Sequence, residues 1–279
     1  MRNIKLIIEY DGTGFNGWQA QVKAKKLRTI QEEIEKAAKK LFNKKISLIG
    51  ASRTDSGVHA KAQTANFRID TTLPLYNIKN GLNSFLMRRI SIISAEEVSL
   101  KFHSRVDSIG KLYKYTIVNR RSRSPLFDRH SAFVPYDLDI TAMKKAAKYL
   151  IGRKDFKSFQ ASDKKERYSI RTVKKIEIIE RPESFPAFHP EEPFDGVYPE
   201  RSRGAQGKLR GEGSHFIDIY IQADGFLYNM ARNIAGTLIE VGRGRFNPEK
   251  VKEILEKKHR PLAGRTAPAK GLCLERVFY

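Results

Sequence analysis

The strongest candidate for chemistry in this 279-residue sequence is one carboxylate, Asp55, in a loop rich in polar side chains. Its close neighbours are a guanidinium, two hydroxyls and a glycine, from Arg53, Thr54, Ser56 and Gly57. A carboxylate in such a setting can attack an electron-poor carbon or stabilise one electrostatically. The alternative is an ordinary polar turn, closed by a hydrogen bond from the aspartate to the backbone.

The elements around this loop must hold it in place. Strand-like runs at 46–49 and 63–69 flank it, so the loop lies on a strand–turn–strand connection, where scaffolds often display functional side chains. Further strands are predicted at 4–10, 90–93, 112–118, 173–179, 216–221 and 272–278, and helices at 30–41, 78–86, 140–150 and 226–241. The first helix opens with the capping box Thr29-Ile30-Gln31-Glu32. Intermixed strands and helices predict an α+β fold.

The charge of the chain favours a polyanionic partner. Lys and Arg number 53 against 31 Asp and Glu, which gives a formal net charge of +22. The basic residues recur along the chain, for example at 23–28, 120–123, 164–167 and 174–175. Because each neutralised phosphate releases a counterion, such a surplus suits RNA spread over a folded surface. An inert basic surface is the alternative.

Several classes of protein do not fit the sequence. The single cysteine, Cys273, excludes an internal disulfide and a cysteine-based zinc site, and the six histidines show no pair at helical ligand spacing. No Gly-Lys-Ser/Thr phosphate loop is present. The apolar run at the N-terminus is too short, and too often interrupted by charged residues, for a signal peptide or a membrane span. We therefore expect a cytoplasmic protein without a metal, a cofactor or a membrane.

One segment departs from the regular pattern. Residues 181–213 hold five of the eleven prolines, together with several glycines and scattered charges. Such a composition does not sustain a helix or a central strand. We interpret the segment as a flexible insertion between two strands, and an RNA-binding arm that uses its arginines and lysine is the alternative.

Motifs along nearly the whole chain resemble the TruA family of tRNA pseudouridine synthases. They are Tyr10-Asp11-Gly12-Thr13 with Gly17-Trp18-Gln19, the eleven residues from Gly50 to Ala60, Phe102-His103-Ser104-Arg105, the run 111–115, the run 155–159, Arg171-Thr172-Val173, the run 226–233 and the run 266–272. The resemblance implies two ferredoxin-like βαββαβ halves, 1–105 and 106–279. Together these halves would form a mixed, mainly antiparallel sheet with a central cleft.

The same resemblance implies an enzyme that isomerises uridine to pseudouridine at positions 38, 39 and 40 of the tRNA anticodon stem-loop. The reaction breaks the N1–C1′ bond, turns the uracil over and rejoins it through C5, without a cofactor. The family's catalytic aspartate falls on Asp55. Direct attack at C1′ and removal of a proton from the sugar both remain open. Family precedent also implies a homodimer that binds tRNA.

Three further residues match the family's pocket. Tyr113 matches the tyrosine that stacks on the target uracil, and Leu272 matches the apolar residue that closes the pocket, although each could be an ordinary core residue of a strand. Arg232 is one of only two charged residues in the predicted helix 226–241, and it lies opposite that helix's main apolar face. A buried guanidinium needs a carboxylate partner, and the family pairs this arginine with the aspartate at Asp55. An exposed arginine or another pairing is the alternative.

The remaining matches concern RNA. Arg53 matches the arginine that fills the space left when the target base flips out of the stem. Phe102, His103, Arg105 and Arg171 match positions that contact the RNA backbone and set its register. A non-catalytic RNA-binding protein on the same scaffold is the competing hypothesis. A protein that only binds RNA would not need all four pocket residues at their motif positions, namely Asp55, Tyr113, Arg232 and Leu272.

Overall fold

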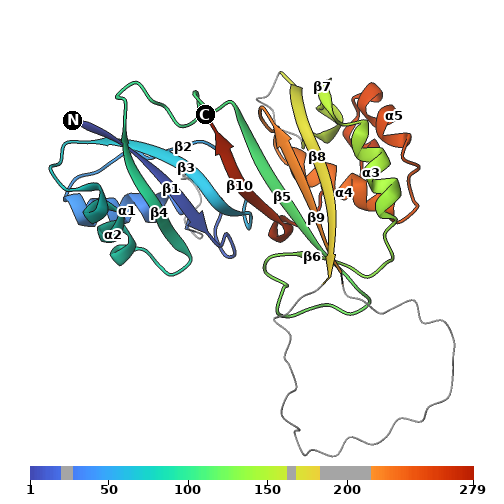
Figure 1. Cartoon of the computed structure of the whole chain (residues 1–279), viewed down its shortest axis with the longest axis horizontal. Coiled ribbons are helices and arrows are strands. Elements are labelled where there is room, and N and C mark those ends of the chain that lie inside the picture. The colour runs from blue at the N-terminus through green and yellow to red at the C-terminus, as the bar shows by residue number, and fades with distance from the viewer. Residues whose placement is uncertain (20–27, 162–167, 183–214) are drawn as a thin grey trace, which may run out of the picture.

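The computed structural model describes residues 1–19, 28–161, 168–182 and 215–279. Within these ranges ten strands form one sheet, and five α-helices pack against it. Helices α1 and α2 accompany the N-terminal part of the sheet, whereas α3, α4 and α5 accompany the C-terminal part (Figure 1). The predicted α+β fold is confirmed.

The N-terminal half has the order βαββαβ. Its elements are β1 (Arg2–Tyr10), α1 (Ile30–Phe42), β2 (Ile49–Gly50), β3 (His59–Ile69), α2 (Leu75–Phe85) and β4 (Ile90–Val98). The strands lie in the order β4-β1-β3, and β2 pairs with the outer side of β3, all antiparallel. This is the ferredoxin-like arrangement predicted from the resemblance.

The C-terminal half repeats that arrangement with additions. Its elements are β5 (Gly110–Asn119), β6 (Ala132–Val134), α3 (Ile140–Lys148), β7 (Gly152–Asp155), β8 (Ile170–Pro182), β9 (His215–Ala223), α4 (Met230–Gly242), α5 (Lys250–Lys257) and β10 (Leu272–Phe278). The strand order β10-β5-β9-β8 matches that of the first half, and β7 extends the edge. The sequence patterns missed β6, β7 and α5.

Strand β10 joins the two halves into one sheet. It pairs with β5 antiparallel and with the start of β3 parallel, through Cys273 against His59 and Leu274 against Ala60. The sheet is therefore mixed and mainly antiparallel, as predicted. Because β3 begins just after the Asp55 loop, this junction brings that loop beside the start of β10.

Local signals fix two helix starts. Thr29 caps α1 with a complete capping box, as the sequence predicts. Helix α4 begins at Met230, so the prediction that it begins at residue 226 is wrong. Asn229 has a φ of 59°, a left-handed conformation that a continuous right-handed helix does not contain.

The predicted boundary near residue 105 lies between β4 and β5, and it stays a prediction. The predicted insertion at 181–213 falls almost entirely outside the described residues. The structure describes the two strands that flank it: β8 ends at Pro182, and β9 begins at His215, which pairs with Pro182.

Excising residues 184–211 and joining β8 to β9 through a short turn is expected to preserve the fold. The paired strand ends need only a short connection, and closing a shorter loop costs less chain entropy. The melting temperature should therefore stay equal or rise slightly, and the affinity for tRNA should not change. A loss of affinity of about tenfold at an unchanged melting temperature would identify the segment as an RNA-binding arm. A full-length variant with its basic residues Arg201, Arg203, Lys208 and Arg210 replaced by glutamine is the matched control.

Candidate active site

A cavity of about 420 Å³ opens where the two halves meet. The Asp55 loop forms one wall, through residues 51–55 and Val58, and the segment 226–232 at the start of α4 forms another. Arg105, Lys111, Tyr113 and Leu272 complete the lining. This volume is typical of a site that binds a small molecule or a single nucleotide. The cavity corresponds to the predicted central cleft.

The ion pair predicted between Asp55 and Arg232 is present. Arg232 Nη1 lies 3.3 Å from Asp55 Oδ2, and both side chains are largely buried, with exposed fractions of 17% and 20%. Two further bonds fix the guanidinium, because Nε donates to the carbonyl of Ala267 at 2.8 Å and Nη1 donates to Asn229 Oδ1 at 2.9 Å. The two halves of the protein thus each supply one member of the pair.

Opposing effects act on the acidity of Asp55. Burial raises the pKa of Asp55 above its ordinary value, and the positive charge of Arg232 and its hydrogen bond act in the lowering direction. Burial dominates, so the carboxyl holds its proton more tightly than an exposed aspartate does. Arg232 is therefore the group that favours the ionised carboxylate in this site.

The N-terminal motif, which contains Tyr10, Gly17 and Trp18, packs against the Asp55 loop and holds it in place. The backbone N–H of Trp18 donates to the carbonyl of Thr54 at 3.1 Å, and the hydroxyl of Tyr10 lies 2.7 Å from that of Thr54 in a buried hydrogen bond. Gly17 has a φ of 75°, and a Cβ at this position would lie 2.5 Å from the carbonyl oxygen of Thr54. A glycine is therefore needed for the two segments to approach this closely.

Tyr113 is a buried aromatic residue that lines the cavity. It is 5% exposed, and its ring meets Phe226 edge-on with 4.8 Å between centroids. Its hydroxyl is hydrogen-bonded to Ser52 Oγ at 2.7 Å, and burial raises the pKa of Tyr113, so it stays a neutral phenol. Leu272, also 5% exposed, lines the same cavity at the first position of β10.

The predicted RNA-contact residues divide into two groups. Arg53 and Arg105 are exposed and line the cavity. Phe102, His103 and Arg171 do not line it. The ring of Phe102 packs on Tyr279 with 5.1 Å between centroids, and His103 Nδ1 accepts backbone N–H groups of the following turn.

Sequence reasoning missed three residues of the site. Ser52 orients Tyr113, Asn229 orients Arg232, and Lys111 lines the cavity beside Tyr113. Lys111 has a usable signal, since it precedes Tyr113 by two residues in a predicted strand and so lies on the same face. Ser52 acts through a contact 61 positions away and Asn229 through a single bond to a residue three positions on, and neither contact leaves a recognisable pattern in the sequence.

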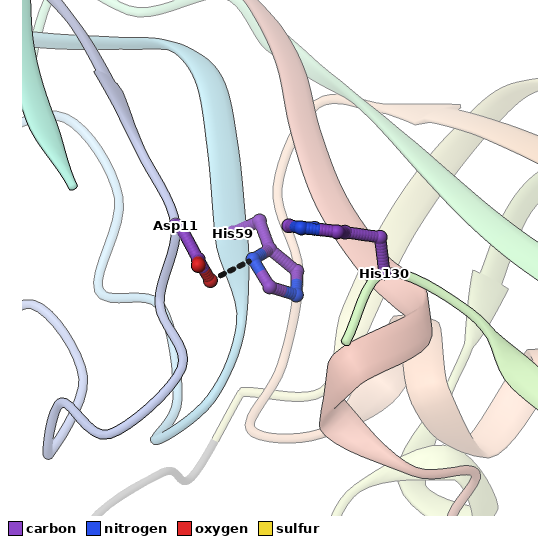
Figure 2. Close-up of side chains that lie close together, drawn as sticks. All are labelled: Asp11, His59 and His130. Carbon is purple, nitrogen blue, oxygen red and sulfur yellow. Dashed lines mark ion pairs between the residues drawn. The ribbon is translucent and has the colours of Figure 1, made fainter. Parts of the chain in front are cut away.

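A second polar cluster lies outside this cavity. Figure 2 shows Asp11, His59 and His130, whose ligand atoms lie within 4.8 Å of one another. Within the described part of the chain, no other group of three or more metal-ligating side chains is this compact. Histidine spacing along the sequence gave no sign of it, because the three residues come from distant segments.

The nitrogens of His59 are already engaged by protein groups. Nδ1 accepts the backbone N–H of Gly12 at 3.1 Å and lies 3.2 Å from Asp11 Oδ1, and Nε2 lies 3.2 Å from the carbonyl of Lys270. A metal ion could bind His59 only by displacing one of these backbone groups. The geometry shows a buried imidazole that ties the turn after β1 and the residues before β10 to the start of β3.

None of the helices in the described ranges has the length and apolar character needed to cross a bilayer. An ion pair between Asp55 and Arg232, in a cavity between two ferredoxin-like halves, is the arrangement that the resemblance to pseudouridine synthases predicts. Comparison with protein families agrees. The chain belongs to the tRNA pseudouridine synthase family, whose pattern it matches over residues 6–107 and 146–279.

Similar proteins carry the same description. The sequence is 43% identical to tRNA pseudouridine synthase A 2 of Clostridium perfringens over 279 residues, which cover 100% of both chains. It is 41% identical to tRNA pseudouridine synthase A of Clostridium acetobutylicum and 42% identical to that of Caldicellulosiruptor bescii, again over 100% of each chain.

Proposed function

We propose that this protein converts uridine to pseudouridine at positions 38, 39 and 40 of the tRNA anticodon stem-loop, with Asp55 as the catalytic carboxylate. The observation that carries the proposal is the ion pair between Asp55 and Arg232 on the wall of a nucleotide-sized cavity. The resemblance of the motifs supplies the three positions.

The reaction needs a carboxylate at the sugar and a pocket that retains the detached base. Asp55 acts on the sugar, either by bonding to C1′ or by removing a sugar proton, and both routes use the ionised carboxylate. After the N1–C1′ bond breaks, the uracil turns and C5 bonds to C1′, while the bond between Asp55 and C1′ breaks or, on the second route, Asp55 returns the proton to the sugar. The hydrogen on C5 then leaves as a proton and N1 gains one, so the product is an isomer of the substrate.

The cavity provides the groups that hold the base during this step. We assign Tyr113 to stacking on the uracil and Leu272 to closing the pocket over it, because both line the cavity that contains Asp55. Retaining the base next to C1′ keeps the second bond-forming step effectively intramolecular. Arg232 holds the carboxylate.

The substrate is an RNA stem-loop, so the target uridine has to leave its stack before it reaches Asp55. We assign Arg53, exposed at the rim, to filling the vacated space. Phe102, His103, Arg105 and Arg171 are assigned to the RNA backbone. On the family's precedent we also propose two functional halves that divide near residue 105, a homodimer, and action in the cytoplasm on tRNA.

Release of tritium from an anticodon stem-loop labelled at C5 of its uridines tests this function, because the new C5–C1′ bond displaces that hydrogen. The purified wild-type protein should release tritium with multiple turnovers and without an added cofactor. RNA binding without any release would instead identify a non-catalytic RNA-binding protein.

Binding of tRNA is expected to weaken steeply as salt rises. With a net charge of +22 the protein should bind through phosphates, and a contact to six or more of them lowers affinity by about a thousandfold between roughly 50 and 200 mM salt. Dissociation constants measured across this range check the slope. A constant that stays flat would contradict a phosphate-dominated interface.

A further inference from the structure

Lys111 projects into the active-site cavity from the same strand as Tyr113. The two residues are separated by one position in β5, so their side chains lie on one face of the sheet, and both line the cavity. Lys114 belongs to the opposite face of β5, where its Nζ lies 3.3 Å from Glu275 Oε1. One strand thus carries a paired lysine on one face and a lysine that faces the cavity on the other.

The ammonium group of Lys111 has no partner within the described part of the chain. No hydrogen bond or ion pair involves it there, although its side chain is partly buried. Burial lowers the pKa of Lys111, and the positive charges of Arg105 and Arg171 lower it further. Asp224 acts weakly in the other direction, and its carboxylate is engaged by the backbone N–H of Thr172 at 3.0 Å.

The two arginines near Lys111 are held by backbone carbonyls. Arg105 Nε donates to Gly50 at 3.4 Å, and Arg171 Nη1 donates to Tyr168 at 3.1 Å and to Ile170 at 2.8 Å. Among the described residues neither guanidinium forms an ion pair with a carboxylate. This distinguishes them from Arg232, which pairs with Asp55.

Lys111 and Arg105 line the cavity, and Arg171 lies close enough to act on Lys111. Asp224 offsets only part of this positive charge, so the three cations repel one another and lose hydration. Such an arrangement is costly unless a ligand supplies the negative charge. The ligand must leave room for a base next to Asp55 and Tyr113, and it must present anionic oxygens at the mouth of the cavity. A phosphodiester attached to the nucleotide in the cavity meets both conditions.

We propose that Arg105, Lys111 and Arg171 form a subsite for one backbone phosphate of the RNA, the phosphate that directly flanks the nucleotide held in the cavity. The inference rests on the proposed function, since it takes the nucleotide in the cavity to be the target uridine. Lys111 is the deepest member of the subsite and contacts the phosphate directly. By fixing this phosphate, it sets how far the sugar enters and so places C1′ beside Asp55.

Lys111→Gln is the direct test, and Lys114→Gln is its matched control because it removes the same charge from the other face of β5. In the control, Glu275 still has a cationic partner, because Lys61 Nζ lies 3.8 Å from its carboxylate. Lys111→Gln should weaken binding of the anticodon stem-loop by about tenfold, and Lys114→Gln by less than about threefold. Lys111→Arg, which keeps the charge, should restore the affinity.

Substrates with a single neutral methylphosphonate identify the phosphate. At one of the two linkages that flank the target uridine, the neutral group should weaken wild-type binding by about tenfold but Lys111→Gln binding by less than about twofold. The proposal is wrong if both proteins lose the same factor at both linkages, or if Lys111→Gln binds RNA as Lys114→Gln does.

Stability separates this role from a structural one. Removing an unpaired cation from among other cations should leave the melting temperature of the free protein equal or higher, and a lower value would indicate a packing role instead. The binding cycle needs no turnover. If wild type makes no pseudouridine but the coupling appears, the proposed function fails while the subsite stands. If pseudouridine forms without coupling, the subsite alone fails.

Discussion

Replacing Asp55 with asparagine is expected to abolish pseudouridine formation while the affinity for tRNA stays within about threefold of wild type. Asparagine keeps the shape of the side chain and a neutral contact to Arg232, but it has no carboxylate to act on the sugar. Loss of a nucleophile or base that nothing replaces lowers the rate by more than about a thousandfold. Single-turnover tritium release and equilibrium binding on the same preparation check both halves of the expectation.

Asp11→Asn is the matched control for this experiment. Asp11 belongs to the neighbouring cluster with His59 and does not line the cavity. Its Oδ1 accepts the backbone N–H of Thr13 at 2.9 Å, a bond that an asparagine oxygen can also accept. The control should retain most of the activity. Substantial turnover by Asp55→Asn, in protein verified free of wild-type enzyme, would remove Asp55 from the mechanism.

Arg232→Met is expected to lower the single-turnover rate by about a hundredfold, because the unpaired carboxylate no longer has a fixed position relative to C1′. A double-mutant cycle with Asp55→Asn should show a coupling of about 0.5–3 kcal/mol in the free energy of unfolding. The 3.3 Å contact between the two largely buried side chains is the source of this coupling. Additive effects would mean that the contact contributes nothing to stability.

The pH profile of the same variant gives an independent readout. Burial raises the pKa of Asp55 and Arg232 opposes this rise, so removing the guanidinium should raise the pKa further. Activity needs the ionised carboxylate, and it is lost as pH falls through that pKa. The acid limb of kcat/KM should therefore move to higher pH in Arg232→Met. An acid limb at the wild-type position would contradict the proposed effect of Arg232.

Local signals in the sequence predict most of the helices and strands, whereas their arrangement in two ferredoxin-like halves is predicted from the family resemblance. The capping box at Thr29 starts α1, and the run 272–278 is β10 with the predicted bounds. The predicted start of α4 is too early because the apolar pattern continues through Phe226 and Leu227, whereas the left-handed backbone of Asn229 separates these residues from the helix. Short elements such as β6 and β7 form only because a longer strand offers a free edge.

The site was predicted less completely, and the reason is distance along the chain. Asp55, Tyr113, Arg232 and Leu272 were found through motifs, and the structure brings them into one cavity. Ser52 is uninformative in sequence because its role is a single bond to Tyr113, 61 positions away. Asn229 is the exception to distance, since it bonds Arg232 only three positions on, but one such bond leaves no recognisable pattern. The cluster of Asp11, His59 and His130 depends on the junction between the halves, which no local pattern encodes.

Mapping pseudouridines in tRNA that has been exposed to the purified protein tests the central claim most directly. Unmodified transcripts would be incubated with wild type or with Asp55→Asn, treated with carbodiimide and read by primer extension. We predict new stops that report positions 38, 39 and 40 with wild type and none with Asp55→Asn. An absence of new pseudouridine with wild type, or the same pseudouridines with Asp55→Asn, would contradict the account.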